Sequence, residues 1–496
     1  MTGLRLYVIT FAMMLSLFLA SIEATVIATA MPTIVAELGG LEIYAWVFSA
    51  YMLASTTMVP IFGKLSDIYG RRRIYLIAVT LFLIGAMLCT QAQSMPQLVF
   101  FRVIQGLGAG GLQPLAFTII GDIFTFEQRA KMQGLFSGVW GVSSLVGPLI
   151  GGFLVDYVAW QWVFWLNLPF GVLAVALMLA AWRPVHPRTG GKVDYWGAAL
   201  LSGGVVMLML ALFELRAGRG INLVNFGATL LGAIVLFGAL LWVERRAENP
   251  ILPLTLFRDR LFVSASGHGF LAGFALFGGA AFVPLFAQAV LGTSATAAGA
   301  TLTPQLLCWT VASIIGSRLL LRFSYRSLAL TGMTLFVIGA SIMTQVSQAM
   351  PAWVLGLGVG LMGTGMGLSI PTFLIAVQAV VPRQSLGTAT ATVQFSRSIG
   401  GAVGTSVMGM ILAAQLAAGL TATGLDPNVV SMDVLLEAHP LVPAATIISM
   451  QSAMAAAMQS VFLAGLVAGI LAWGMTALAP RERIGQPTPV KPAARA

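Results

Sequence analysis

The chain has 496 residues, of which 58% are hydrophobic and only 8% are charged. Because a soluble domain usually carries about 25% charged residues, this composition excludes an ordinary soluble protein and predicts an all-α polytopic membrane protein. The net charge of +10 would suit a nucleic-acid-binding protein, but the basic residues have another explanation in their placement along the chain.

Apolar stretches of roughly twenty residues recur along the whole chain, and each is long enough to cross a bilayer as a helix. Helices are expected because lipid cannot satisfy backbone hydrogen bonds. The first stretch, Tyr7 to Met31, is too long for the apolar core of a signal peptide and predicts an uncleaved first span. We predict fourteen spans, at residues 8–31, 45–62, 74–92, 97–120, 132–154, 162–182, 195–213, 223–243, 261–290, 298–320, 327–346, 352–379, 387–413 and 456–479.

The Lys and Arg residues predict the orientation of these spans. With the N-terminus in the cytoplasm, all 26 of them fall in cytoplasmic segments except Arg102, Arg216, Arg219 and Arg397. An even number of spans puts both termini on one side, and the positive-inside rule makes that side the cytoplasm. We therefore expect a multi-pass protein of the cell inner (plasma) membrane whose partners include the lipid bilayer but no nucleic acid.

The first cytoplasmic turn, residues 63–73, has the sequence GKLSDIYGRRR. Its glycines permit a tight reversal between two spans. Asp67 and Arg71 are four residues apart, which would pair their side chains if the segment is helical. The alternative is a basic loop that only sets the orientation of the chain.

Four motifs resemble those of the major facilitator superfamily, in the expected order and at the expected spans. Residues 63–73 resemble its signature loop between helices 2 and 3, and residues 102–108 (RVIQGLG) resemble the arginine motif linked to proton coupling. Residues 138–152 (GVWGVSSLVGPLIGG) resemble the antiporter motif. Residues 23–32 (EATVIATAMP) resemble the first-helix motif of the fourteen-spanner drug:proton antiporters of the EmrB/QacA type, and residues 160–171 also look like that family.

This resemblance implies a major facilitator fold, with two six-helix bundles plus two inserted helices. Residues 316–326 look like a degenerate copy of residues 63–73 eight spans later, an offset that equals one bundle plus the insertion. The expected organisation is an N-terminal bundle at 1–182, a linker with two inserted transmembrane helices at 183–260, a C-terminal bundle at 261–480 with an outside loop at 414–455, and a cytoplasmic tail at 481–496. We expect the apolar 414–455 loop to pack partly on the membrane surface.

The resemblance also implies roles for individual residues. Proton coupling would belong to Glu23 and Arg102. The conformational-switch loop would contain Gly63, Asp67, Gly70, Arg71 and Asp122, although solvated loop charge is an equal alternative for Asp122. The antiporter motif would contain Gly138, Gly141, Gly147, Pro148 and Gly151.

Glu23 is the only Asp or Glu well inside any predicted span, and an intramembrane acid is a functional hypothesis by default. The motif usually has Asp at this position, so Glu23 keeps the charge with a longer reach. Arg102 is its natural partner, because both residues should lie about 8–12 Å below the outer surface. The alternatives are a purely structural acid and an arginine that snorkels to the interface.

The glycines of residues 138–152 continue a spacing of small residues that would give this helix a flat face against which another helix can rock. Pro148 would weaken the helix locally. Ordinary close packing needs the same glycines, so the spacing alone does not favour export. The resemblance to the antiporter motif does.

Several polar side chains in the spans are candidates for a transport cavity. The candidates are Trp46, Gln105, Gln113, Gln305, Gln394 and Arg397. Arg397 lies one turn from Gln394 and would either line the pore or tie the bundles together. Asn167, Gln288 and Gln378 could also line such a cavity, but isolated glutamines in membrane helices often only bridge neighbouring helices. A histidine inside a membrane helix, such as His268, is more often a packed polar residue than a proton relay.

The sequence lacks the motifs of rival functions. No phosphate-binding loop of a primary pump occurs, and no His/Cys cluster has the spacing of a metal site. We therefore expect no enzyme, no metal and no cofactor. The expected function is a proton-coupled antiporter for multidrug efflux, exporting lipophilic monovalent cations or neutral amphipathic compounds by alternating access. The alternatives are a lipid or glycolipid exporter of the same fold and a proton-coupled nutrient uptake system.

Overall fold

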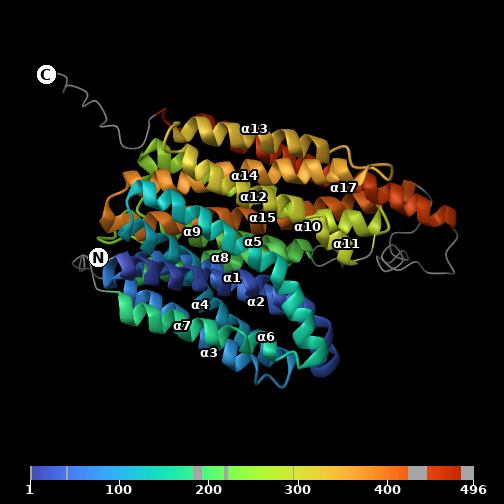
Figure 1. Ribbon diagram of the computed structural model, residues 1–496. Helices are drawn as coiled ribbons and strands as arrows, with labels where there is room; N and C mark the ends of the chain where they lie inside the picture. The colour runs from blue at the N-terminus through green and yellow to red at the C-terminus, as the bar shows by residue number, and fades with distance from the viewer. Residues whose placement is uncertain are drawn as a thin grey trace.

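The computed structural model describes residues 3–40, 43–182, 193–216, 222–293, 295–422 and 444–481, and the regular structure in these ranges is all helical (Figure 1). The first helices along the chain are α1 (Gly3–Leu38), α2 (Tyr44–Tyr69), α3 (Arg71–Cys89), α4 (Met95–Ile123), α5 (Phe126–Tyr157), α6 (Trp162–Trp165) and α7 (Asn167–Ala181). Two helices fall in the predicted insertion, α8 (Tyr195–Arg216) and α9 (Leu223–Glu244). The later helices are η2 (Leu256–Arg258), α10 (Arg260–Ala289), α11 (Ala295–Ala300), α12 (Thr303–Leu319), α13 (Tyr325–Met343), α14 (Ala352–Val380), η3 (Arg383–Ser385), α15 (Leu386–Ala422) and α17 (Ala444–Ala477).

Thirteen helical segments of the described chain are long and apolar enough to cross a membrane. The remaining long helix, α5, has 32 residues, and with it the number of long segments equals the predicted fourteen. Two predicted spans are each divided between two helices. The sixth span consists of α6 and α7, and the tenth consists of α11 and α12, where Pro304 stands in the first turn of α12. Proline suits a first helical turn because it has no backbone N–H to leave unpaired.

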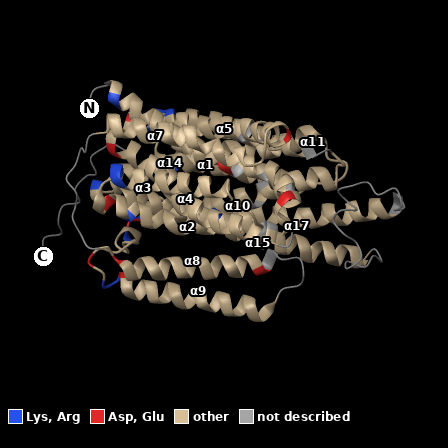
Figure 2. Ribbon diagram, turned by 90° about the horizontal axis from the view of Figure 1, so that it is seen from below, with Lys and Arg blue, Asp and Glu red and all other residues tan. Residues whose placement is uncertain are grey.

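The helices pack into two groups with a separate pair beside them. In the first group α4 packs between α2 and α3, and α1 packs on α5 and α7. In the second group α14 packs between α12 and α13, and α10 packs on α15 and α17. The groups meet where α2 contacts α15 and α5 contacts α12. Helices α8 and α9 pack on each other along one side of the molecule, where α8 also contacts α2 and α15 (Figure 2). The domain boundaries given above stay predictions.

Both described ends of the chain lie at one end of the molecule. Figure 1 shows that α1 begins, and α17 ends, at the end where α2 gives way to α3. Figure 2 shows Lys and Arg gathered at that same end and few charges along the helices. This distribution is the one that the positive-inside rule requires of a cytoplasmic face. The side of the membrane on which this end lies stays a prediction.

The structure adds detail to two of the predicted loops. The predicted outside loop at 414–455 is largely helical at both ends, because α15 continues to Ala422 and α17 begins at Ala444. These flanks are rich in alanine, the best helix former. Residues 423–443, with their predicted packing on the membrane surface, lie outside the described ranges. The tight reversal at 63–73 is also shorter than expected, since α2 runs to Tyr69 and Gly70 alone, with φ 90°, makes the turn into α3. That φ is unfavourable for residues other than glycine.

Candidate transport and coupling site

Glu23 and Arg102 form a buried ion pair between α1 and α4. One carboxylate oxygen of Glu23 contacts the Nη1 atom of Arg102. The two residues are only 2% and 1% exposed, so the alternative of an arginine that snorkels to the interface is wrong. The expected pairing is confirmed, whereas a role in proton coupling stays a prediction.

Other side chains complete the hydrogen bonding of this pair. Asn167, at the start of α7, donates to the second oxygen of Glu23 at 2.8 Å. Arg102 donates from Nη1 to the Gln105 side chain at 2.8 Å and from Nε to the backbone carbonyl of Val47 at 3.2 Å. Its guanidinium also lies 4.0 Å from the ring centroid of Tyr51, a favourable cation–π arrangement. Because a buried ion pair is stable only when its remaining donors and acceptors are satisfied, these partners hold both charges in a fixed geometry.

These residues come from α1, α2, α4 and α7, and we call Glu23, Arg102, Gln105, Asn167 and Tyr51 the membrane cluster. Its tightness depends on a glycine in α4. A Cβ atom at Gly106 would lie 2.6 Å from the backbone oxygen of Tyr51, so any larger residue would push α2 away from α4. Gly106 therefore allows Tyr51 to reach the guanidinium of Arg102.

A second set of charges joins the two helix groups near the end of α2. Asp67 and Arg71 form the expected ion pair, and the Nε atom of Arg71 donates to Asp122 at 2.8 Å. Asp67 also accepts hydrogen bonds from α15, from the backbone N–H of Gly387 at 3.0 Å and from the N–H and hydroxyl of Thr388 at 2.8 and 2.6 Å. These three charged residues with Gly387 and Thr388 form what we call the switch network.

The switch network closes the contact between the two groups at this end. Arg71 also donates to the backbone oxygen of Arg383 at 3.3 Å, and Arg129 donates to that of Gln378 at 3.0 Å. A Cβ atom at Gly63 would meet Ala391 and the backbone of Gly387. Side chains of the first group therefore hydrogen-bond to backbone groups near the end of α14 and the start of α15.

The glycines of α5 touch two different partners. A Cβ atom at Gly147 would meet the hydroxyl of Thr25, and one at Gly151 would meet the hydroxyl of Thr29, both on α1. A Cβ atom at Gly141 would lie 2.8 Å from the hydroxyl of Thr310 on α12, in the other group.

The remaining members of the predicted motif differ from these glycines. Gly138 has open space where its Cβ would stand. The side chain of Pro148 lies outside the described part of the structure. The motif therefore lies between α1 and α12, and its transport role stays a prediction.

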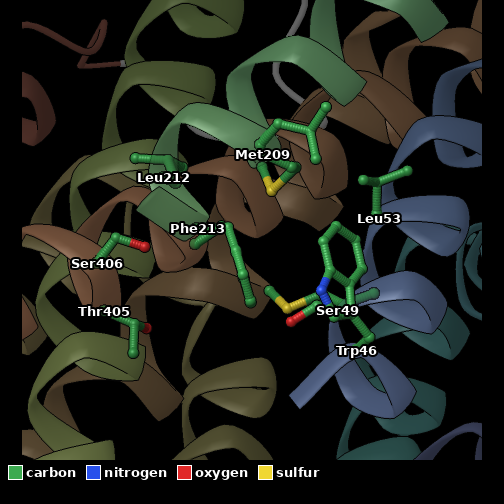
Figure 3. Close-up of a pocket in the computed structure, with 11 residues that line it drawn as sticks. Trp46, Ser49, Leu53, Met209, Leu212, Phe213, Thr405 and Ser406 are labelled. Atoms are coloured by element: carbon green, nitrogen blue, oxygen red, sulfur yellow. The ribbon is translucent and has the colours of Figure 1, made fainter. Parts of the chain in front are cut away.

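Trp46 lines a cavity of about 80 Å³ where α2, α8 and α15 meet (Figure 3). Its ring lies 4.8 Å from that of Phe213, on the inserted helix α8. The hydroxyls of Thr405 and Ser406 come from α15. The cavity walls therefore belong to both groups and to the insertion.

The other predicted cavity residues are not gathered in that cavity. Gln105 belongs to the membrane cluster, Gln305 and Gln394 are buried, and Gln113 is half-buried. Gln378 donates to Phe117 of α4 at 3.2 Å, which is the bridging role left open for it. The role of each residue in a transport cavity stays a prediction.

His268 is buried and packs as the commoner interpretation expects. Its Nδ1 atom lies 3.2 Å from the hydroxyl of Thr476, and its ring lies 4.8 Å from that of Phe373. These contacts join three helices of the second group.

Sequence reasoning missed some contributors to both sites. Tyr51 and Val47 hold Arg102, and they lie one turn apart on the same face of the second span, but nothing marks this face in the sequence. Gly387 and Thr388, which are more than 300 residues away in the sequence, bond to Asp67 mostly through backbone groups. Backbone donors carry no identifying residue type, so only the three-dimensional structure could find them.

The model of the Major Facilitator Superfamily matches residues 13–405. The chain belongs to this superfamily. It is 37% identical to the multidrug transporter protein MdtP of Bacillus subtilis (strain 168) over 406 residues, which are 81% of this chain and 74% of that protein. It is also 37% identical to multidrug resistance protein 3 of the same organism over 403 residues, 81% of this chain and 79% of that protein.

Solved structures share the fold. The human organic anion transporter MFSD10 (TETRAN) aligns with a TM-score of 0.63 at 14% identity, over 93% of this chain and 99% of that one. The proton:xylose symporter XylE aligns with a TM-score of 0.59 at 14% identity, over 96% of each chain. The predicted major facilitator fold is confirmed, and the chain is a multi-pass membrane transporter and not an enzyme.

Proposed function

We propose that this transporter is a proton-coupled antiporter that exports small amphipathic compounds by alternating access, as a fourteen-spanner of the EmrB/QacA type. It would act in multidrug efflux in the plasma (inner) membrane, with both termini in the cytoplasm. The coupling residues are Glu23 and Arg102. The observation that carries this proposal is the placement of an ionisable carboxylate, satisfied by one arginine, deep inside a membrane-spanning group of helices.

The membrane cluster can exist in two states of charge. With Glu23 ionised, its charge is balanced by Arg102 and the cluster is neutral. Arg102 keeps its charge under all physiological conditions, so a proton bound by Glu23 leaves the guanidinium without its partner. A buried, unbalanced charge is costly. The protonated cluster therefore favours a conformation in which Arg102 finds other partners, and proton binding and conformational change are coupled.

A route for this coupling runs along α5. Thr25 lies two residues from Glu23 and meets Gly147, and α5 in turn reaches α12 through Gly141 and through a 2.7 Å hydrogen bond between the hydroxyls of Ser137 and Ser313. A movement of α1 that follows protonation would be passed to the contact between the two groups. Alternating access in transporters of this kind is largely a rocking of one bundle against the other.

Relatives support efflux, since MdtP and multidrug resistance protein 3 carry multidrug names at 37% identity. An intramembrane carboxylate such as Glu23 would attract lipophilic cations. Arg102 occupies that carboxylate here, so a cation could use Glu23 only after Arg102 leaves. Neutral amphipathic compounds face no such competition. Lipid or glycolipid export and nutrient uptake are the alternative outcomes of the test.

The test is proton movement in inverted membrane vesicles on addition of amphipathic compounds. We expect wild type to release protons from an acidified lumen in response to substrate, and Glu23→Gln to lose that response. The matched control is Glu37→Gln, which removes an exposed acid of the same helix whose carboxylate accepts from the indole N–H of Trp160. A response that survives Glu23→Gln would move the coupling site elsewhere. A response to sugars or amino acids, with none to amphiphiles, would favour uptake.

A further inference from the structure

One turn of α15 carries polar side chains that have no partner among the residues that the structure describes. Residues 395–398 are half-buried, whereas residues 391–394 and 399–402 on either side are buried. The turn contains Ser396, Arg397 and Ser398. In the described part of the chain, none of the three side chains makes a hydrogen bond, an ion pair or a ring contact. The half-buried turn therefore carries hydrogen-bond donors that the described residues leave without an acceptor.

This turn lies deep in the molecule. Helix α15 contacts α10, α14 and α17 of its own group, α2 and α4 of the other group, and α8 of the insertion. Arg397 is nine residues along α15 from Thr388 of the switch network, which places it about 14 Å deeper at 1.5 Å per residue. That depth is near the middle of a hydrocarbon core of about 30 Å. Arg397 is therefore too deep for its charge to be explained by the membrane surface.

A second donor without an acceptor lies beside Arg397. Gln394 is 4% exposed, and its Nε2 atom is buried with no hydrogen-bond partner in the described structure. Residues three apart lie on the same face of a helix, so Gln394 and Arg397 are neighbours. A guanidinium has donors and no acceptor. The pair thus offers several N–H groups and one positive charge to a group that would accept hydrogen bonds.

We propose that Gln394 and Arg397 form the binding site for an acidic group of the exported compound, and that the cargo includes amphipathic carboxylates. This inference rests on the proposed function, and it names the charge of the cargo. Glu23 already has Arg102 as its partner, so the unbalanced intramembrane charge in the described structure is positive. A carboxylate matches the fork of a guanidinium with two parallel hydrogen bonds, and the amide of Gln394 adds a third donor.

The site also agrees with the energetics of export. An isolated charge in a low-dielectric interior is expensive, and it is retained where a partner neutralises it for part of the cycle. A bound carboxylate would neutralise Arg397 while the compound crosses. Outward movement of an anion is also favoured by a membrane potential that is negative inside, and it adds to the drive from inward proton movement.

The experiment measures binding to the full-length protein in detergent micelles with three matched naphthalene probes. These are 1-naphthaleneacetate, its neutral amide 1-naphthaleneacetamide, and the cation (1-naphthylmethyl)trimethylammonium, followed by naphthyl fluorescence. We expect wild type to bind the acid most tightly. Arg397→Gln should weaken binding of the acid by about tenfold or more, since a hydrogen bond to a charged group contributes about 1.5–3 kcal/mol, and should leave binding of the amide within about twofold.

Two further variants separate the site from folding and from net charge. Gln394→Glu keeps Arg397 but gives it an internal carboxylate one turn away, so it should weaken binding of the acid as Arg397→Gln does. Arg318→Gln removes an exposed positive charge from the last turn of α12 and should change nothing. Equal binding of acid and cation by wild type, no binding of the acid, or normal binding of the acid by both site variants would each overturn the proposal.

Failure of the anion-site proposal can be distinguished from failure of the proposed proton-coupled function. Preference for the acid without any substrate-driven proton movement in vesicles would keep the anion site and reject proton coupling. Proton movement driven equally by all three probes would keep coupling and reject the anion site. Competition of the acid by phosphatidylglycerol added to the micelles, at a concentration where phosphatidylcholine has no effect, would reassign the site to a lipid headgroup and overturn the cargo assignment.

Discussion

The membrane cluster and the switch network are both built on a carboxylate and an arginine, but they join different parts of the transporter. In the membrane cluster every partner of Glu23 and Arg102 belongs to the first helix group. In the switch network Asp67 reaches across to Gly387 and Thr388 of the second group. The first set can change its charge without breaking a contact between groups. The second contains the bonds from Gly387 and Thr388 to Asp67, and loss of these bonds would weaken the contact between the groups.

This difference indicates a division of labour. In the proposed mechanism, a proton on Glu23 would alter the balance of charge inside one bundle, and helix packing would have to transmit the conformational change to the interface. The structure offers α5 for this purpose, between Thr25 on α1 and Thr310 on α12. The switch network, which bonds to backbone groups of α15, would then determine how firmly this end is closed.

The largest effect should come from breaking the ion pair of the membrane cluster. Glu23→Leu leaves Arg102 buried with a charge that it cannot lose, and we expect a cost of about 3–5 kcal/mol. Arg102→Met should cost less, because Glu23 can become neutral by binding a proton. The double variant should recover most of the loss. The measurement is the thermal unfolding midpoint of the purified proteins in one detergent, and equal midpoints for Glu23→Leu and the double variant would contradict the pair's importance.

A smaller effect is expected when the switch network loses its link between groups. Asp67→Asn weakens the bonds from Gly387 and Thr388 and removes the ion pair with Arg71, so it should favour the state open at this end by about 2–3 kcal/mol. The opening can be measured as a spin-label distance between Arg73→Cys and Arg322→Cys in a Cys308→Ser background.

The matched control for this experiment is Asp122→Asn. It makes the same change of charge and also loses a bond to Arg71, but the described contact of Asp122 stays within the first group. We expect its distance distribution to resemble wild type. If both aspartate variants open the transporter equally, then net charge is responsible and the bonds across the interface are not.

The link between the two regions is tested by two glycines of α5. A methyl group at Gly147 would collide with the Thr25 hydroxyl, so Gly147→Ala should cost about 1–3 kcal/mol through overpacking and slow transport. Gly138→Ala is the control, because open space lies where its Cβ would stand. Transport rates and unfolding midpoints of the two variants give the comparison. A defect of similar size in both would show that glycine is needed for backbone reasons alone.

The sequence predicted the charged pairs because charges are so rare in this chain. Glu23 and Arg102 could be paired from depth alone, and Asp67 and Arg71 from their spacing on one helix. It could not predict that Gln105 would bond to Arg102, since a glutamine in a membrane helix bonds to whichever partner is close. The sequence also did not indicate the helical flanks of the 414–455 segment. Alanine and serine are only weakly apolar, so a helix rich in them is hard to distinguish by composition from a loop at the membrane surface.

The partners of Asp67 on α15 show most clearly which contacts could not be predicted from the sequence. They also lead to the smallest predicted effect. Thr388 contributes a backbone N–H and a hydroxyl to the same carboxylate oxygen. Thr388→Val removes only the hydroxyl and keeps the shape, so it should favour opening by about 0.5–1.5 kcal/mol, less than Asp67→Asn. Thr405→Val is the control, since that hydroxyl bonds within its own helix to Gly401. The same spin-label distance measures how far each of the three variants opens. An effect of Thr388→Val equal to that of Asp67→Asn would assign the closure to the threonine hydroxyl and leave little contribution for the backbone donors.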